Sequence, residues 1–203
     1  NTQSMAYRIP LEPSYATNVT DYLGAGALAM TTNGMSMYPI MFPDIPSIDP
    51  EHEARDGHDR AKNMMLDGQM DSCNEHSGRG FDVHYHGDPV CMYNDTASGH
   101  SALIGWAADG FGLYGPRDVD GTRVDPDVDL DRCMGHVGDR GDGTSGYHYH
   151  VSPKFPYTIA CWHGDVSAVS YERGGQPGDH QWAFDNSRDR DDRDKLLPCC
   201  DDP

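Results

Sequence analysis

Two copies of a short alternating motif constrain this chain more than any other feature of its sequence. Each copy holds two histidines two residues apart, His84 and His86 in the first and His148 and His150 in the second. Side chains two apart in a β-strand point to the same face of a sheet. Each copy therefore predicts a strand that presents two imidazoles on one face, with Cα atoms about 7 Å apart. Paired imidazoles of this kind are a common start of a metal site.

The flanks of the two histidine pairs also agree. An Asp-x-Cys-x-x-His element precedes each pair, and a proline followed by a cysteine comes after it. An Asx-Gly turn with a tyrosine four residues after its glycine recurs as well. The repeated positions are Asn33 and Asp109, Tyr38 and Tyr114, Asp71 and Asp131, Cys73 and Cys133, His76 and His136, Pro89 and Pro153, and Cys91 and Cys161. This agreement predicts a duplicated structural unit.

The duplication predicts a single, mainly β and loop-rich domain built from two pseudo-symmetric half-repeats. We place the domain at residues 31–164, with half-repeats at about 31–100 and 101–164. Residues 1–30 and 165–203 are then N- and C-terminal arms. Within the first half, an insertion is expected to hold a short helix at 61–65. The apolar run at 101–108 predicts a central buried strand.

These motifs resemble the YHYH-domain family, whose secreted or cell-surface members are named for the Tyr-His-Tyr-His tetrapeptide. The resemblance covers about residues 30–164 and leaves out the arms. Val83 replaces the first tyrosine of the upstream tetrapeptide, and Met134 stands where the family usually has a small polar residue. The resemblance implies architecture and an extracellular location rather than a particular activity. It rests on Ala108–Pro116, Leu130–His136, Gly146–His150 and Phe155–Cys161.

The histidines of the motifs are the candidate metal ligands. Imidazole nitrogens favour Cu or Zn, and each half offers three of them. We expect His84, His86, His148 and His150 as inner ligands, with His76 and His136 as helpers. The halves then build two separate sites or one shared site at the axis between them. In the alternative interpretation, these histidines pack as half-buried strand residues that hydrogen-bond to backbone carbonyls.

A run of aspartates gives a second candidate site, because oxygen-rich loops suit Ca²⁺. The run surrounds Gly121, and it lacks the bidentate glutamate of an EF-hand. The candidate calcium ligands are Asp118, Asp120, Asp125, Asp127 and Asp129.

Six cysteines in an acidic, glycine-rich chain predict disulfides and an oxidising compartment. Either Cys73 pairs with Cys91 and Cys133 with Cys161, or the equivalent cysteines cross between the halves. Cys199 and Cys200 are adjacent, so they form a vicinal bridge, reach two other partners or cross-link chains. Sequons at Asn18 and Asn94 are candidate glycosylation sites.

The formal charge of −18 disfavours nucleic acid and anionic membranes as partners, because both need basic patches. The sequence has no run of about 18 apolar residues, so it does not predict a membrane-spanning helix. The chain begins at Asn1 without a signal peptide, so we expect a processed mature chain that is secreted or displayed at the cell surface.

Together these features predict an extracellular structural or surface protein with histidine-based metal binding. The arms are expected to join copies into a homo-oligomer or fibre, because neither arm can bury much against so small a domain. A secreted Cu- or Zn-dependent redox or hydrolytic enzyme and a monomeric metal-binding protein are the alternatives. No Gly-x-Ser-x-Gly, Walker or His-Glu-x-x-His motif indicates a specific reaction.

Overall fold

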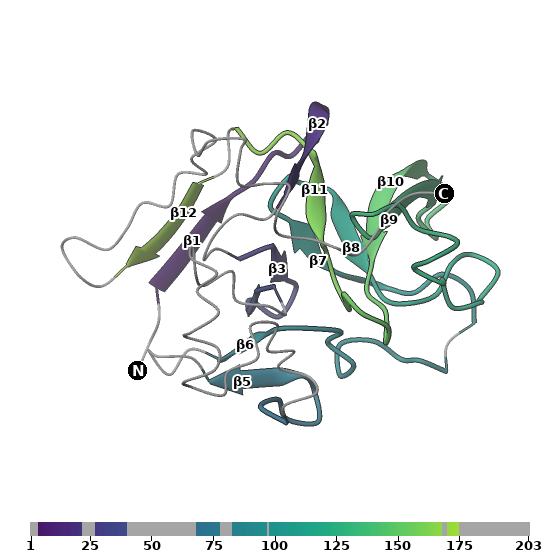
Figure 1. Ribbon diagram of the computed structural model, residues 1–203, viewed down its shortest axis with the longest axis horizontal. Helices are drawn as coiled ribbons and strands as arrows, with labels where there is room; N and C mark the ends of the chain where they lie inside the picture. Colours follow the sequence, from purple (N-terminus) through teal and green to yellow (C-terminus); the bar gives the residue numbers. More distant parts are fainter. Residues whose placement is uncertain are drawn as a thin grey trace, which may run out of the picture.

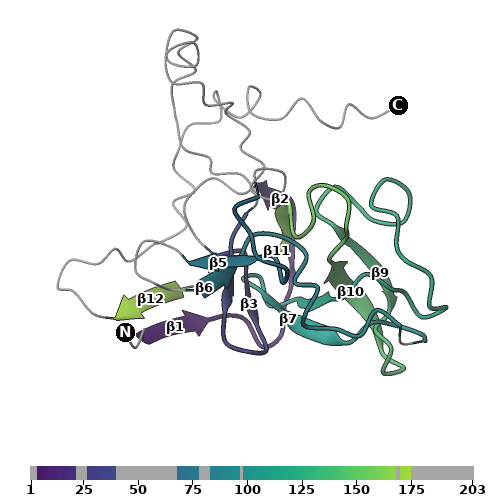
Figure 2. The same cartoon turned by 90° about the horizontal axis from the view of Figure 1, so that it is seen from below.

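The structure is a computed structural model that describes residues 4–21, 27–39, 68–77, 83–96, 98–167 and 170–174. These residues form strands joined by loops, without a helix, so the prediction of a mainly β, loop-rich chain is confirmed (Figures 1 and 2). Within this part of the chain, no helix is long and apolar enough to cross a membrane. The strands are β1 (Ser4–Arg8), β2 (Tyr15–Asp21), β3 (Ala29–Thr31), β4 (Ser36–Met37), β5 (Glu75–Ser77), β6 (Val83–Tyr85), β7 (Leu103–Ala107), β8 (Gly112–Tyr114), β9 (Gly135–Asp139), β10 (Ser145–His150), β11 (Cys161–Gly164) and β12 (Ser170–Gly174).

One eight-stranded sheet carries both histidine motifs, in the order β5-β6-β4-β3-β7-β8-β10-β9. Its centre is the antiparallel pair β3–β7, in which Ala29 lies opposite Ala107. On each side of the centre, a hairpin (β3–β4 or β7–β8) is followed by a parallel pair (β4–β6 or β8–β10) and then an antiparallel edge pair (β6–β5 or β10–β9). The pairing thus follows the order of the predicted half-repeats, while the pseudo-symmetry of their backbones stays a prediction.

Two small sheets join the beginning of the chain to its later part. Strand β2 pairs with β11, and β1 pairs with β12, so β1 and β12 lie side by side in Figure 1. Residues 4–21, which we expected to belong to an arm, therefore pair with strands of the same chain. The boundaries of the domain and arms stay a prediction. The expected helix at 61–65 and residues 175–203 lie outside the described residues.

The Asx-Gly turns explain how each central hairpin reverses. Gly34 and Gly110 both have positive φ, 85° and 89°, which glycine adopts without strain. At Gly110, a Cβ would also collide with the carbonyl oxygen of Pro10. The side chain of the preceding residue then reaches the tetrapeptide: Asn33 Nδ2 donates to Tyr85 Oη at 3.0 Å, and Tyr149 Oη donates to Asp109 Oδ2 at 2.5 Å.

The tyrosines of the tetrapeptides face the hydrophobic core, and the histidines between them face away from it. Tyr85, Tyr147 and Tyr149 belong to the core cluster together with Leu113 and Trp162. Asp109 lies fully buried in this core, where its carboxylate accepts hydrogen bonds from the Tyr149 hydroxyl and from the backbone N–H of Gly164. Burial raises the pKa of Asp109. The alternation predicted from the His-x-His spacing therefore places aromatic rings on one face and imidazoles on the other.

Candidate metal centres

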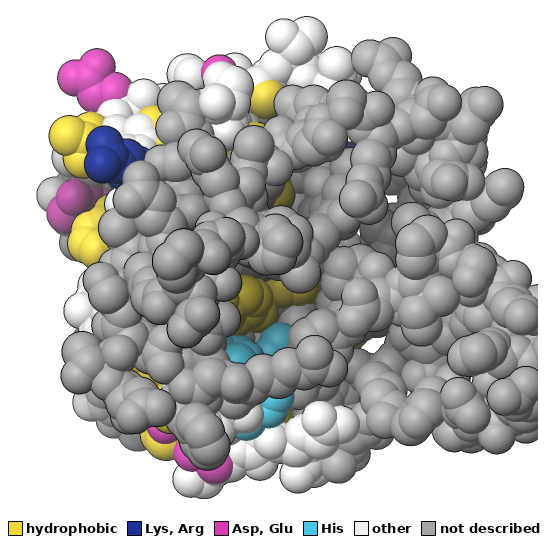
Figure 3. All heavy atoms as spheres, turned by 90° about the vertical axis from the view of Figure 1, so that its left-hand side faces the viewer, with side chains coloured by type: hydrophobic (Ala, Val, Ile, Leu, Met, Phe, Trp, Pro, Cys, Tyr) yellow, Lys and Arg dark blue, Asp and Glu magenta, His cyan; other side chains and the backbone are white. Residues whose placement is uncertain are grey.

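The first histidine cluster lies on the antiparallel strand pair β5–β6. The antiparallel register sets His76 opposite His84, and His86 follows the end of β6 on the same face. The Nε2 atom of His84 lies 3.0 Å from that of His76 and 3.0 Å from that of His86. His84 is 8% exposed and His86 is 1% exposed. On the side of the molecule that carries β1 and β12, Figure 3 shows histidine side chains beside hydrophobic side chains.

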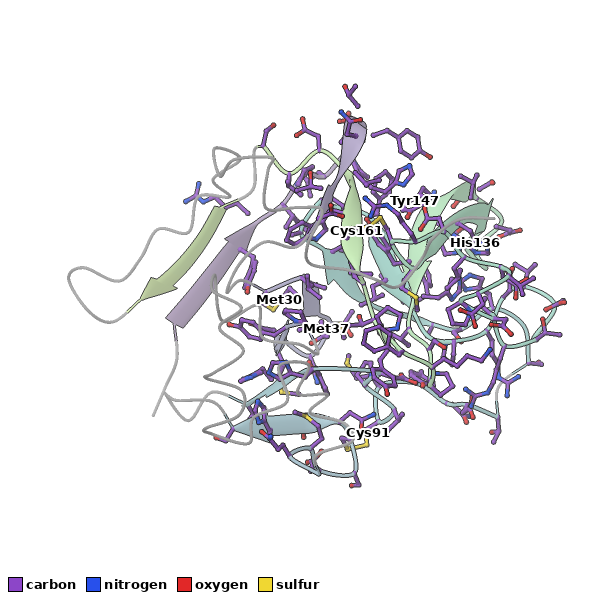
Figure 4. All side chains as sticks on the ribbon, in the orientation of Figure 1. Met30, Met37, Cys91, His136, Tyr147 and Cys161 are labelled. Carbon is purple, nitrogen blue, oxygen red and sulfur yellow. A yellow bond between two sulfur atoms is a disulfide. The ribbon has the colours of Figure 1, made fainter. Side chains whose placement is uncertain are left out.

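The second cluster forms in the same way between β9 and β10. The register sets His136 opposite His148, and their Nε2 atoms lie 3.1 Å apart. Figure 4 shows His136 at this end of the sheet, close to Tyr147 of the neighbouring strand. A histidine that the motifs did not predict joins from the loop before β7: His100 Nε2 lies 3.2 Å from His148 Nε2. Its ring centre is 5.1 Å from that of His150, which is also the distance from His136 to His150.

The ligand atoms of His76, His84 and His86 all lie within 4.8 Å of one another, as do those of His100, His148 and His150. Five strand spacings separate β6 from β10 in the sheet, which puts the two clusters about 24 Å apart. The structure therefore contains two separate clusters and no shared cluster at the sheet centre among the described residues.

Backbone carbonyls fix which nitrogen carries the proton in four of these histidines, His86, His100, His148 and His150. A carbonyl can only accept, so Nδ1–H must be the donor in each contact. In the second cluster Nδ1 of His100 donates to Ser101 O at 2.8 Å, that of His148 to Gly146 O at 2.9 Å, and that of His150 to Gly115 O at 2.6 Å. The first cluster repeats this contact, from His86 Nδ1 to Pro39 O at 2.6 Å.

This arrangement leaves lone pairs on Nε2 that face one another. The Nε2 atoms of His100 and His148 are 3.2 Å apart with no proton of their own between them, and His150 Nε2 is buried without a hydrogen-bond partner. Facing lone pairs repel unless a cation lies between them. With metal–nitrogen bonds of about 2.0–2.1 Å, the nitrogens of a tetrahedral zinc site are separated by about 3.3–3.4 Å. The observed spacing is within a few tenths of an ångström of that requirement.

Burial keeps these rings neutral, which is the form that binds metals. It is the main cause that lowers the pKa of His86 and of His148 to about 4 and that of His150 to about 3. The neighbouring imidazoles lower the three pKa values further. Protonation of these rings is therefore unfavourable near neutral pH, and a proton does not fill the space between them.

The sequence profile of the family described as "YHYH protein" matches residues 6–125, which is more than half of the chain. The chain belongs to the YHYH family. The matched range begins inside the segment we expected to be an N-terminal arm and ends before the second histidine pair. Searches of curated proteins and of solved structures gave no match.

Two disulfides of this YHYH protein lie beside its histidine clusters. Cys73 is bonded to Cys91, with Cα atoms 5.2 Å apart, and Cys133 to Cys161, with Cα atoms 4.6 Å apart. These pairs are the first of the two arrangements that the sequence allowed. Cys199 and Cys200 lie outside the described residues.

The aspartate run of the YHYH chain is engaged in local contacts. Asp120 Oδ1 accepts from the N–H and hydroxyl of Thr122, and Asp125 Oδ1 pairs with Lys154 Nζ at 2.7 Å. Among the described residues, Asp118, Asp120, Asp125, Asp127 and Asp129 are not part of any group of close ligand atoms, and calcium stays a prediction.

A further acidic group, Asp71, Cys73 and Glu75, is a turn rather than a metal site. The Cys73 sulfur is in a disulfide, and Asp71 Oδ1 accepts from the backbone N–H groups of Cys73 and Glu75 at 2.8 and 3.1 Å. Of the two sequons, Asn18 lies in β2 and Asn94 in a loop, both with exposed side chains. Glycosylation at these positions stays a prediction.

Proposed function

We propose that this YHYH protein is an extracellular metal-binding protein that holds one Cu or Zn ion in each histidine cluster. The observation that carries the proposal is the convergence of Nε2 atoms in each cluster. In the second cluster, three Nδ1–H groups are bonded to backbone carbonyls, which aims three lone pairs at one small volume. Hydrogen bonds of this kind orient metal-binding histidines and raise their basicity.

The donor set favours borderline metals. Each triad offers nitrogen alone, and Zn and Cu bind imidazole, whereas Ca²⁺ and Mg²⁺ need oxygen ligands. The hydrogen bonds to backbone carbonyls that our alternative interpretation predicted are present, but in His148 and His150 they use Nδ1 and not Nε2. Simple packing of the histidines therefore does not account for the contacts between the Nε2 atoms.

The metals have a structural role in this proposal. His86, His148 and His150 are almost completely buried, and closed sites of this kind hold metal for stability, whereas catalytic sites keep an open position. Each ion would link the two strands of an edge pair, because His76 and His84 come from paired strands, as do His136 and His148.

An extracellular location is supported by the two disulfides, which persist in oxidising compartments. The YHYH resemblance to secreted and cell-surface proteins has the same implication.

The test is metal analysis of the purified full-length chain, followed by titration of the EDTA-treated protein with Zn²⁺ and Cu²⁺. We expect about two ions per chain, and none in the double variant with His84→Ala and His148→Ala. His163→Ala is the matched control, because His163 lies outside both clusters. Absence of Zn and Cu from the native protein, combined with no uptake near neutral pH, would refute the proposal.

We also propose that copies of the chain associate into a homo-oligomer or filament. The eight-stranded sheet ends on β5 and β9, which have no further strand partner among the described residues. Strand β9 presents Val137, which is 67% exposed, and an open edge of this kind can pair with another chain. Light scattering with and without EDTA tests this: a monomer of 22.4 kDa in both conditions would exclude assembly.

A further inference from the structure

A cavity of about 400 Å³ lies beside the second histidine cluster. The strand register puts part of its lining on the same face of the sheet as the imidazoles, while Phe111 and Tyr147 of the lining belong to the hydrophobic core. Tyr114 is paired with His150 in β10 and with Leu103 in β7, and Gly112 is paired with Trp106. Side chains of laterally paired residues point to the same face. Tyr114 packs edge-on against His100, with ring centres 4.9 Å apart, so it separates the cavity from the metal cluster.

Two glycines in the lining of this cavity, Gly112 and Gly146, lie on the imidazole-bearing face of β8 and β10. A Cβ at Gly112 would lie 2.8 Å from Tyr114 Cε2 and 3.1 Å from Leu103 Cδ1. The missing side chain therefore lets the ring of Tyr114 and the side chain of Leu103 pack down onto the backbone of β8.

The walls are aromatic and apolar. Trp106 is 42% exposed, although it is a large hydrophobic side chain in a central strand. Leu103, Tyr114 and Tyr15 are among the other side chains of the lining. Aromatic walls of this kind suit a ring-shaped ligand that stacks against them.

Arg140 brings a positive charge to the same cavity. Its guanidinium lies over Gly146, at 3.5 Å from where a Cβ of that residue would be. It makes no ion pair with a described residue, and its Nε is buried without a hydrogen-bond partner. The nearby acids accept hydrogen bonds in their own turns, since Asp139 Oδ1 accepts from Gly141 N and Asp142 Oδ1 from Thr144 N. The hydrogen bonds from Thr144 lower the pKa of Asp142, and the charge of Arg140 lowers it further. The guanidinium thus lies near this carboxylate without forming an ion pair with it.

We propose that this cavity binds a carboxylate carried on a six-membered ring. The ring lies against Trp106 and Tyr114, and the carboxylate pairs with the guanidinium of Arg140. The planar fork of arginine matches a carboxylate with two parallel hydrogen bonds. Two kinds of ligand carry a carboxylate on a six-membered ring: a uronic-acid unit of an acidic polysaccharide and a free aromatic acid. The site does not depend on metal in the histidine cluster.

The experiment is calorimetric titration of the full chain with digalacturonate and, separately, with benzoate, at low ionic strength. Wild type is expected to bind at least one of them with a Kd below about 1 mM. Arg140→Gln is expected to weaken binding about tenfold or more, because it removes a charge-assisted hydrogen bond. Arg132→Gln is the matched control: Arg132 is exposed and pairs with Asp21, outside the cavity, so binding should match wild type.

Binding of digalacturonate alone assigns the cavity to acidic polysaccharide, and binding of benzoate assigns it to aromatic acids. A Trp106→Ala variant checks the stacking wall and should weaken binding of either probe. The proposal is overturned when neither probe binds at the upper concentration, or when Arg140→Gln binds as tightly as wild type. Equal weakening by Arg132→Gln would also overturn it, because the effect would then reflect net charge.

Discussion

Replacing His100 by alanine removes one of the three ligand nitrogens of the triad His100, His148 and His150 and leaves the first cluster intact. Loss of an outer-shell partner alone costs about 10–100-fold in metal affinity, so loss of a ligand should cost about 100-fold or more. With zinc at about 1,000 times the wild-type Kd, an occupied site stabilises the fold by about 4 kcal/mol. After a 100-fold loss, the same zinc concentration gives about 1.4 kcal/mol.

The second site should therefore contribute about 2.7 kcal/mol less in His100→Ala than in wild type. For a chain of this size, 1 kcal/mol shifts Tm by about 2–4 °C, so the zinc-induced rise in Tm should shrink by about 5–11 °C. Thermal unfolding with and without zinc measures this difference, and calorimetry should show one strong site instead of two. His163→Ala is the control and should keep the full rise. An unchanged rise in His100→Ala would show that His136 completes the triad and that His100 is not a ligand.

Three further outcomes follow from the core and the disulfides. Tyr149→Phe removes a hydroxyl that donates to buried Asp109 and accepts from the N–H of His163, so chemical denaturation should show a loss of about 2–4 kcal/mol. Because burial raises the pKa of Asp109, its contribution to stability is fully present below the unfolded-state pKa of about 3.9 and is lost as pH rises through the folded-state value. Asp109→Asn should lack that slope when stability is measured from about pH 3.5 to 7. The double variant Cys133→Ser with Cys161→Ser opens a loop with a sequence separation of 28, which should cost about 3–4 kcal/mol in the same assay.

The sequence predicted the half of each histidine cluster that depends on local spacing. His84 and His86, like His148 and His150, lie two apart in a strand, so their shared face follows from the strand period alone. His76 and His136 were predicted from repetition, and the antiparallel register explains their place opposite the first histidine of each pair.

His100 could not be predicted in the same way, because it reaches the cluster through tertiary structure. It lies in the loop before β7, and the position equally far before Tyr38 is Gly24, so the repeat carries no second copy of it. The one signal was its place just ahead of the most apolar run of the chain, which was predicted to be central in the sheet. Likewise, carbonyl acceptors such as Gly115 O and Pro39 O belong to the backbone, and residue identity says nothing about them.

Met134 shows how a departure from the family pattern can be physically consistent. It has a positive φ of 75°, as Asn74 does at 64° in the first half. Asparagine adopts this left-handed conformation readily, whereas methionine does so at a cost. Met134 is buried and its carbonyl accepts from the N–H of His150, so packing and a hydrogen bond offset the strain. Because the turn shape is kept, the replacement does not displace His136.

The spacing within Asp-x-Cys-x-x-His follows from three contacts that one turn must make. Asp131 Oδ1 accepts from the N–H groups of Cys133 and Gly135, which closes the turn. The cysteine within that turn is bonded to β11, which anchors the start of β9. The histidine is the first residue beyond the turn whose side chain lies on the imidazole face of β10. Insertion of one residue between cysteine and histidine would move the imidazole to the opposite face, because side chains alternate along a strand. Turn, disulfide and histidine thus belong to the same hairpin, and the motif spacing is the geometry that lets the three coexist.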